Sequence, residues 1–186
     1  MDLKETIKKR ASIKKYSDKK PKIVDVVKAV ESANVAPSPG NLAILRYLII
    51  EDLDKIEKIA EACQQEFIKG AKVLVVFLSE SKDCEIMYDK RAKKYVKQHV
   101  GAAAENFLLT LTDLGLSSCW VGAWSDISLR NILVIPDNVD IEAIFPVGYQ
   151  MKIDHKKQRI KPKIEGRLYF DNWKNKFRKP FESISD

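Results

Sequence analysis

The stretch QHVGAAAENFLLTLTDLGLSSCWVGAW, residues 98–124, decides the fold. Over residues 100–114 its apolar side chains recur at three- and four-residue spacing, which predicts a helix that is apolar over a wide face. Gly115 stands where a helix often ends in a left-handed residue. The alanines at 102–104 let another backbone approach closely, so we expect a central helix packed against a sheet or a second subunit. The run at 118–124 predicts a strand that leads into a loop.

Helices and strands alternate on both sides of this stretch. Asp2, Asp52 and Asp126 stand where a carboxylate can cap a helix, and Pro21 suits a first helical turn. The polar segment 79–98 predicts an exposed helix or an excursion. The other expected elements are helices at 3–9, 23–33, 53–67 and after Asp126, and strands at 45–50, 73–78 and 141–150, the last ending at Gly148. No break in composition separates these elements, so the sequence predicts a single α/β or α+β domain over residues 1–186.

Composition and charge limit the class of protein. A chain of 186 residues with 45% hydrophobic content is long enough to bury a substantial core. The net charge of +7 favours an anionic ligand without identifying it. Cys63, Cys84 and Cys119 are widely spaced and form no CxxC pair, which is typical of reduced thiols in a cytosolic protein. No signal peptide or long apolar run is visible, so we expect a cytoplasmic protein without a membrane span.

Several common catalytic sites are not predicted. The two histidines, His99 and His155, have no cysteines or paired carboxylates at ligand spacing, so the sequence predicts no metal site. The motifs GxGxxG, GxxxxGK[ST] and GxSxG do not occur. No nucleophile, acid and base stand in a recognisable arrangement. If the chain is an enzyme, a bound cofactor is expected to carry the reaction.

The stretch KKRASIKKYS, residues 8–17, is strongly basic. Three interpretations are open: a solvated helix end, a surface for nucleic acid or another polyanion, and a site for one small anion. A nucleic-acid surface needs a continuous basic face with stacking aromatic residues. In this sequence the cations instead form two clusters, near residue 10 and near residue 159, far apart along the chain. This arrangement favours a single small anion if the fold brings the two clusters together.

Five short motifs occur in order along most of the chain. They are RASIKKY (10–16), APSPGN (36–41) with LRYLII (45–50), the stretch 98–124, IPDNVDIEAIFPVGYQ (135–150), and KKQRIKP (156–162) with DNW (171–173). As an ordered set they resemble the FMN-dependent nitroreductase family. The resemblance implies an α+β fold with a central, mostly antiparallel sheet flanked by helices. It also implies an intertwined homodimer, active sites at the subunit interface, and a C-terminal arm, about 155–186, that packs on the partner.

The resemblance assigns the phosphate end of FMN to residues from both ends of the chain. Arg10 and Ser12 match family residues that hold the phosphate or ribityl group, and Lys14 matches a cation near flavin N1 and O2. Lys157 and Arg159 match a late Lys-x-Arg pair, with a register uncertain by one or two residues. A guanidinium can donate two parallel hydrogen bonds to a phosphate, so the residue types suit this task.

The resemblance assigns the ring of FMN to two loops. Asn41 matches an asparagine at the flavin ring edge, and its amide offers donors and an acceptor. Val121, Gly122 and Ala123 match the loop that passes close to the ring, with the Gly122 N–H near N5. Gly148 matches a strand end near the phosphate, although an ordinary strand-terminal glycine explains it nearly as well.

Other positions depart from the family pattern or have a structural explanation. Many members carry Gln and Trp where Ala43 and Leu45 stand, and an acidic residue where His99 stands. The effect of these changes on the substrate side is open. Trp120 and Trp124 are expected to pack in the core or at the dimer interface rather than to stack on the flavin.

The activity implied by the resemblance is that of an FMN-dependent NAD(P)H oxidoreductase. Its reaction is ping-pong: NAD(P)H gives a hydride to flavin N5 and leaves, and a small acceptor such as a nitroaromatic or a quinone follows. The expected cofactor is FMN with NAD(P)H as co-substrate, in a homodimer that binds no nucleic acid, membrane or metal. The alternative from another class is a basic polyanion- or nucleic-acid-binding protein without redox activity.

Overall fold

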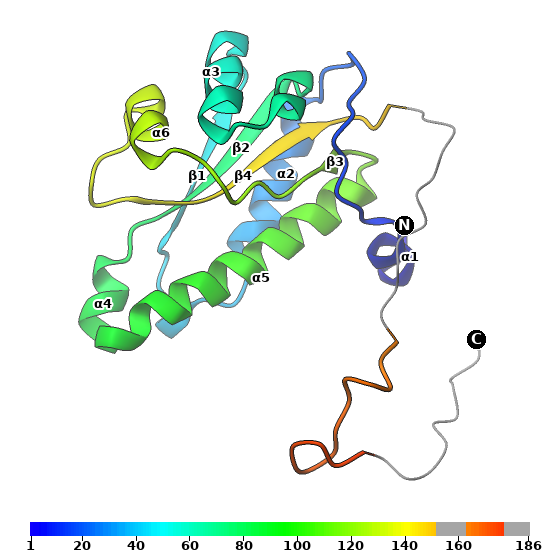
Figure 1. Cartoon of the computed structure of the whole chain (residues 1–186), viewed down its shortest axis with the longest axis vertical. Helices are drawn as coiled ribbons and strands as arrows, with labels where there is room; N and C mark the ends of the chain where they lie inside the picture. Colours follow the sequence, from blue (N-terminus) through cyan, green and yellow to red (C-terminus); the bar gives the residue numbers. More distant parts are fainter. Residues whose placement is uncertain (152–162, 177–186) are drawn as a thin grey trace. The chain divides into compact units, whose positions relative to one another are not determined.

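The computed structural model describes residues 1–151 and 163–176. The chain separates into two compact units, Met1–Lys152 and Ile153–Asp186. The first unit carries the sheet and the named helices (Figure 1). In the second unit, Tyr169 packs against Trp173 with ring centroids 4.8 Å apart. The expected single domain with a C-terminal arm on a partner stays a prediction.

A four-stranded antiparallel sheet lies at the centre of the first unit. Its strands are β1 (Leu45–Ile50), β2 (Val73–Ser79), β3 (Ser117–Ser118) and β4 (Asp140–Gly148), in the spatial order β1-β2-β4-β3. The expected α+β class with a mostly antiparallel sheet is therefore confirmed. The two strands with the most continuous apolar sequence, β2 and β4, occupy the middle of the sheet, where both faces are covered.

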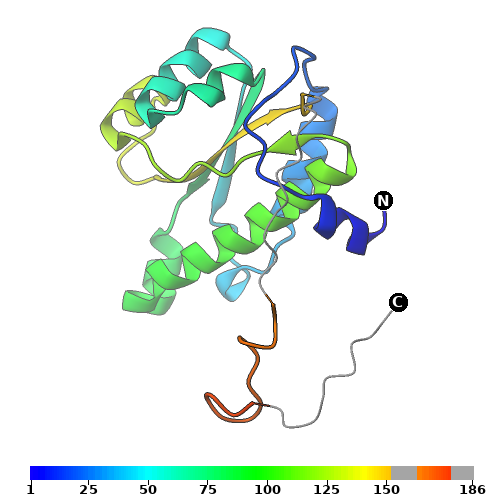
Figure 2. The same ribbon diagram turned by 45° about the vertical axis from the view of Figure 1, so that its right-hand side comes forward.

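Helices cover both faces of this sheet, as Figures 1 and 2 show. One face packs against α2 (Ile23–Asn34) and α5 (Ala92–Asp113). The other face packs against α3 (Leu53–Cys63), the short helix η2 (Glu66–Gly70) and α6 (Asp126–Leu133). Because neighbouring side chains of a strand point to opposite faces, β2 contributes to both cores. Val73, Val75 and Phe77 join the α2–α5 core, and Leu74, Val76 and Leu78 join the other.

Aromatic rings fill the centre of the α2–α5 core. Phe77 of β2 lies 4.8 Å from Tyr47 of β1, 5.3 Å from Phe107 of α5 and 4.8 Å from Phe145 of β4, measured between ring centroids. These edge-on and tilted contacts are the geometries that aromatic pairs prefer. The group ties α5 to three strands, so α5 and the loops at its ends have a fixed place on the sheet.

The helix α5 is longer than the sequence pattern predicts. It begins at Ala92, whereas the apolar periodicity predicts a start near residue 100. The segment 79–98, expected to be an exposed helix or an excursion, is helical: it contains α4 (Lys82–Tyr88), a turn of 3₁₀ helix, η3 (Asp89–Arg91), and the first two turns of α5. The apolar pattern misses the start of α5 because only Ala92, Val96 and His99 of its first turns are buried. A narrow buried stripe among lysines gives too weak a pattern to predict the helix.

Two other helix ends differ from the expectation. The helix predicted to reach Phe67 ends at Cys63, because Gln64 takes a left-handed conformation (φ 52°). The N-cap of α6 is Ser125 rather than Asp126: the Ser125 hydroxyl accepts a hydrogen bond from the Ser128 N–H. Asp126 lies in the first turn and pairs with Arg130 at 2.6 Å.

The N-terminal helix agrees with the sequence prediction. The helix α1 spans Leu3–Lys9, and the Asp2 carboxylate accepts a hydrogen bond of 2.8 Å from the Glu5 N–H. The terminal amine of Met1 pairs with Asp113 at the end of α5. The α1 helix therefore lies beside the C-terminal half of α5, as Figures 1 and 2 show. The last turn of α1 leads directly into the basic stretch, which therefore begins beside α5.

Candidate functional site

The basic segment 10–14 lies beside the strand that leads into the loop at 121–123. Ser12 forms a parallel bridge with Ser118, and the Ile13 N–H donates to the Ser118 carbonyl at 3.0 Å. Burial raises the pKa of the Cys119 thiol, and the nearby charge of Lys14 and a hydrogen bond from Ser12 partly offset this rise. The structure thus brings two of the predicted site segments together although more than a hundred residues separate them.

The loop at 121–123 offers an open stretch of main chain. Val121 is buried and exchanges backbone hydrogen bonds with Ile144 of β4 at 2.9 and 3.1 Å. Gly122 and Ala123 are exposed, and a Cβ on Gly122 would meet no atom within 4 Å. Gly122 also has no positive φ, so neither packing nor backbone geometry within the described residues requires a glycine. An open main chain of this kind fits the close approach of a planar ring.

Arg10 is held against the central helix. It caps the C-terminus of α1, and its Nε lies 3.5 Å from a carboxylate oxygen of Glu105 in α5. The Arg10 side chain is only 15% exposed, so packing as well as charge fixes its position. A guanidinium is planar and can donate two parallel hydrogen bonds to an anion.

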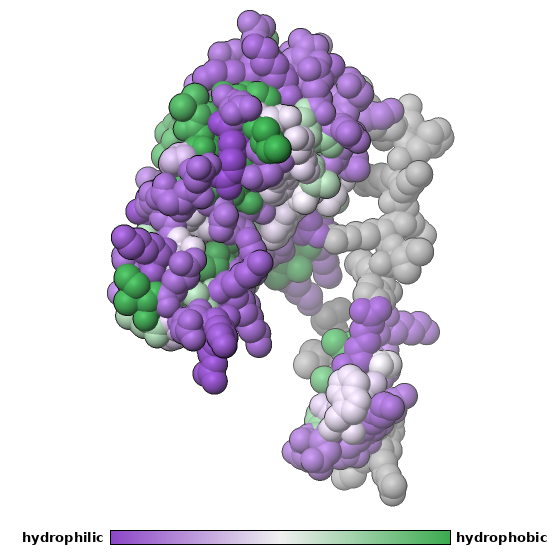
Figure 3. Space-filling model, turned by 60° about the vertical axis from the view of Figure 1, so that its left-hand side comes forward, coloured by the Kyte–Doolittle hydropathy of each residue, from purple (hydrophilic) through white to green (hydrophobic). Residues whose placement is uncertain are grey.

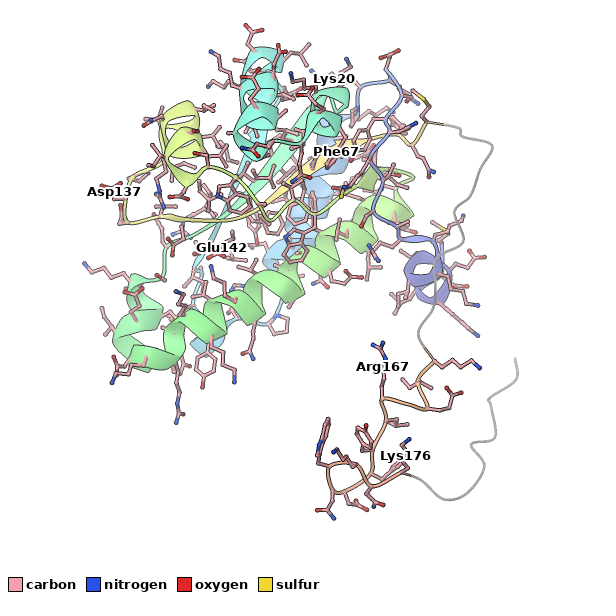
Figure 4. All side chains as sticks on the ribbon, in the orientation of Figure 1. Lys20, Phe67, Asp137, Glu142, Arg167 and Lys176 are labelled. Carbon is pink, nitrogen blue, oxygen red and sulfur yellow. The ribbon has the colours of Figure 1, made fainter. Side chains whose placement is uncertain are left out.

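Lys14 lies on the other side of the basic segment. Its ammonium group is 4.8 Å from the ring centroid of Phe67, which belongs to η2 (Figure 4). This distance is typical of a cation–π contact. The predicted contact of Lys14 with flavin N1 and O2 stays a prediction, as do the assignments of Arg10 and Ser12.

Gly148 has a packing role that the sequence does not reveal. A Cβ at this position would lie 2.7 Å from Cδ1 of Tyr16. The Tyr16 ring is buried, and its hydroxyl donates to the carbonyl of Ile13 at 2.6 Å and lies 3.2 Å from that of Pro146. Burial strongly raises the pKa of Tyr16. The glycine is thus explained by the close approach of Tyr16, which anchors the basic segment to β4.

Replacement of Gly148 by alanine is expected to reduce the free energy of unfolding by about 1–2 kcal/mol, because the added methyl group overlaps the Tyr16 ring. Urea unfolding measures this loss. The double variant Gly148→Ala with Tyr16→Ala removes the overlap, so the glycine substitution should have little effect in that background. An equal loss in both backgrounds would contradict the packing role of Gly148.

Asn41 lies in the loop that follows α2. It ends the short helix η1 (Pro39–Asn41), where Gly40 and Asn41 both have left-handed backbones, with φ of 57° and 58°. A Cβ on Gly40 would lie 2.7 Å from Sδ of Met87, so the loop packs tightly on the end of α4. The loop contacts the N-terminal half of α5, whereas Arg10 meets α5 further along, at Glu105. The structure therefore places Asn41 and Arg10 at different stretches of one helix.

The same loop forms one wall of a cavity of about 440 Å³. The cavity was not predicted from the sequence. Its lining residues come from the loop, from the end of α4 and from α5: Pro37, Ser38, Pro39, Tyr88, Tyr95, Gln98, His99 and Ala102. Three of them, Tyr95, Gln98 and His99, belong to the part of α5 before residue 100 that the apolar periodicity did not predict, which is why no pattern indicated the cavity.

The remaining predicted residues have mixed outcomes. Lys157 and Arg159 lie outside the described residues. Trp120 is 41% exposed, and its ring lies in an edge-to-face arrangement with Phe145, with the centroids 5.5 Å apart. Trp124 is partly buried and packs against the α3–α6 core. Of the two departures from the family pattern near Asn41, Ala43 is exposed and Leu45 is buried at the start of β1.

A charged pair with one buried partner lies between the sheet and α5. The Glu142 side chain, on β4, is 2% exposed and extends toward α5 (Figure 4). Its carboxylate accepts hydrogen bonds from the Ser79 hydroxyl at 2.8 Å and from the Lys97 ammonium at 2.5 Å. A glutamate inside the apolar run IEAIFPVG is the one sequence signal that marks this pair. The pair holds the N-terminal half of α5, and with it one side of the cavity, to the sheet.

A comparison with family models decides the family. The model described as "Nitroreductase family" matches residues 7–75 and 62–149, which include the basic segment, α5 and the loop at 121–123. The chain belongs to the nitroreductase family. The predicted resemblance and fold are therefore confirmed.

Relatives of this nitroreductase-family chain carry different names. An Archaeoglobus fulgidus protein with the provisional name NADH dehydrogenase/NAD(P)H nitroreductase is 30% identical over 145 residues, covering 75% of this chain and 80% of the relative. A Thermotoga neapolitana protein named iodotyrosine deiodinase is 25% identical over 158 residues, covering 76% and 85%. The FMN-dependent nitroreductase structure from Clostridium difficile superposes with a TM-score of 0.77 at 22% identity, covering 92% of this chain and all of that one. This last likeness shows the fold.

Two other kinds of feature are absent from the described ranges. No helix of residues 1–151 or 163–176 is long and apolar enough to cross a membrane. In the same ranges, no group of three or more His, Cys, Asp or Glu side chains is arranged to hold a metal ion. Most of the face in Figure 3 is hydrophilic, with apolar side chains gathered in a few separate places.

Proposed function

We propose that this chain is an FMN-dependent NAD(P)H oxidoreductase of the cytoplasm that acts as a homodimer. The observation that supports the proposal best is the meeting of the basic segment 10–14 with the open loop at 121–123. A phosphate needs cations and a hydroxyl donor, and a flavin ring needs exposed main chain without side chains in the way. Both requirements are met within two segments joined by the Ser12–Ser118 bridge.

The side chains of this site have distinct tasks in the proposal. Arg10 and Ser12 bind the phosphate or the ribityl group, and Lys14 places positive charge beside the pyrimidine edge of the ring. The main chain at Gly122 lies along the ring and donates its N–H near N5. Lys157 and Arg159 are proposed to reach the phosphate from the end of the chain. The bound flavin supplies the hydride-transfer chemistry, and these residues bind and orient it.

A homodimer accounts for the separate place of Asn41. Arg10 and Asn41 meet different stretches of α5 in one chain. We propose that a second copy brings its own Asn41 loop to the ring edge of the flavin, and that the C-terminal arm packs on the partner. Two-fold dimers are the most common oligomers, and a shared interface gives each copy an identical site.

The relatives leave the electron acceptor open. One is named for NAD(P)H and nitro compounds and another for iodotyrosine. We propose reduction of a small nitroaromatic or quinone by NAD(P)H in two half-reactions. Steady-state assays with both nicotinamides against nitroaromatics, quinones and iodotyrosine would identify the acceptor.

The direct test of FMN binding is optical. Purified full-length protein should be yellow, or become yellow after incubation with FMN and removal of free flavin, and NAD(P)H should bleach the colour. A protein that takes up no FMN would contradict the proposal. If such a protein bound DNA with an affinity that fell steeply with salt, the basic segment would instead serve a polyanion.

A further inference from the structure

The ammonium group of Lys14 contacts an aromatic ring instead of a carboxylate. It lies 4.8 Å from the ring centroid of Phe67 in η2, which is a typical distance for a cation–π contact. Within residues 1–151 and 163–176, Lys14 forms no ion pair with a carboxylate. The ring of Phe67 is therefore the group that determines where this ammonium lies.

The main chain around Lys14 is fixed, which leaves only its side chain to be positioned. The Ile13 N–H donates to the Ser118 carbonyl at 3.0 Å, and the Lys15 carbonyl accepts from the Met151 N–H at 3.1 Å. A lysine side chain has many rotamers, so ordering it on binding a ligand is entropically unfavourable. A contact that fixes the ammonium group in advance removes this unfavourable contribution from ligand binding.

Phe67 is itself well fixed in the fold. Its ring is half-buried and packs against the α3–α6 core, and the next residue, Ile68, is fully buried. A Cβ on Gly70, at the end of η2, would lie 3.8 Å from Cδ2 of Tyr16. The short helix η2 thus lies against the N-terminal segment that carries Lys14 (Figure 4). The ring can act as a rigid support for the ammonium group.

An aromatic ring positions a cation without neutralising its charge. Lys69, two residues after Phe67, is instead paired with Glu57 and Glu66, each at 3.3 Å. The carboxylate next to Phe67 in the sequence is thereby paired with a different lysine. The ring attracts the ammonium group of Lys14 through its quadrupole but carries no net charge. The full positive charge of Lys14 remains available to an anionic group.

We propose that Phe67 is a positioning residue for Lys14, whose ammonium group it holds in reach of the negative charge that reduced FMN carries around N1 and O2. This inference rests on the proposed function, in which Lys14 lies beside the pyrimidine edge of the flavin. A nearby cation favours the charged form of a group over its neutral form. Phe67 should therefore raise the affinity for reduced FMN more than that for oxidised FMN. Because it acts through Lys14, its effect should vanish when Lys14 is replaced.

Proton NMR of the full-length protein without FMN tests the contact itself. The ring current of Phe67 should shift the ε-methylene protons of Lys14 upfield from those of the other lysines. Lys14→Gln assigns this signal by removing it. Phe67→Leu should abolish the shift, and Phe67→Tyr, which keeps the ring, should preserve it. Absence of the shifted signal in the unmodified protein would overturn the proposal, even if Phe67→Leu fails to fold.

Anaerobic titration with oxidised FMN and with dithionite-reduced FMN tests the role of the contact. In Phe67→Leu the affinity for reduced FMN should fall about two- to fivefold relative to that for oxidised FMN. Phe67→Tyr should keep the ratio of the two affinities found in the unmodified protein. A purely structural defect would weaken binding of both forms equally, so the ratio separates positioning from damage to the fold.

Two further variants connect the effect to Lys14. In the Lys14→Gln background, Phe67→Leu should leave the ratio unchanged. Lys15→Gln removes a neighbouring exposed cation and should keep the ratio of the unmodified protein. A protein that takes up no FMN would overturn the proposed function and, with it, this role of Phe67. Normal FMN binding with an unchanged ratio in Phe67→Leu would overturn only the role of Phe67.

Discussion

Replacement of Arg10 by alanine should weaken FMN binding by more than tenfold. In the proposed site the guanidinium donates charge-assisted hydrogen bonds to the phosphate, and such bonds contribute roughly 1.5–3 kcal/mol. Arg10 is 15% exposed and held by Glu105, so its loss is not compensated by a simple movement of a neighbour. Fluorescence titration of flavin-free protein with FMN gives the dissociation constant.

Two matched variants separate a specific contact from general charge. Lys9→Ala removes the same charge from the exposed last turn of α1 and should change the FMN dissociation constant far less. Arg10→Lys keeps the charge but loses the planar fork of donors, so an intermediate loss is expected. If Arg10→Ala and Lys9→Ala weaken binding equally, the phosphate is attracted only by the overall positive field. An unchanged dissociation constant in Arg10→Ala would remove this residue from the site.

Replacement of Lys97 by alanine should reduce the free energy of unfolding by about 2–3 kcal/mol. The change leaves the carboxylate of Glu142, which is 2% exposed, with only the Ser79 hydroxyl as a partner. Breaking a buried ion pair from one side commonly reduces stability by about 3–5 kcal/mol. Lys97 is itself 52% exposed, so water can approach the vacated place and the expected loss is smaller. Urea unfolding at one protein concentration measures the loss.

Replacement of Glu142 tests whether the loss of stability in Lys97→Ala comes from the carboxylate that is left without its cation. Glu142→Gln keeps a side chain of the same shape and its hydrogen bond with Ser79, and leaves Lys97 to be solvated, so its loss should be about 1 kcal/mol or less. In the double variant no buried charge remains. Lys97→Ala combined with Glu142→Gln should therefore be more stable than Lys97→Ala alone. Additive losses in the double variant would show that the pair has no mutual interaction.

The parts of the fold that depend on apolar repetition could be predicted from the sequence. The strand β2 is an almost continuous apolar run, β1 and β4 are mostly apolar, and the part of α5 from Val100 onward has a wide apolar face. The first turns of α5 could not be predicted, because their buried stripe is narrow and stands among exposed lysines. The cap of α6 was assigned to Asp126 because both Ser125 and Asp126 are good capping residues, and only the backbone decides between them.

The candidate site was predictable only where short motifs carry it. The motifs RASIKKY (10–16) and CWVGAW (119–124) can be recognised in the sequence, and the Ser12–Ser118 bridge brings these two segments together in the fold. The sequence offered two interpretations of Gly148, and the contact with Tyr16 supports the structural one. His99 and the tyrosines of the cavity lie in or next to the segment 79–98, whose apolar pattern does not decide between a helix and an excursion.

The division of β2 between two cores has a consequence for how the first unit comes apart. Alternate residues of this one strand support the helices on either side, and β4 likewise contributes to both. If one layer of helices detached, the apolar side chains on that face of β2 and β4 would be exposed to water, while the other layer still covered the opposite face. Opening of the two layers is therefore expected to be concerted, and the amides of β2 and β4 should exchange with solvent only when the whole unit unfolds.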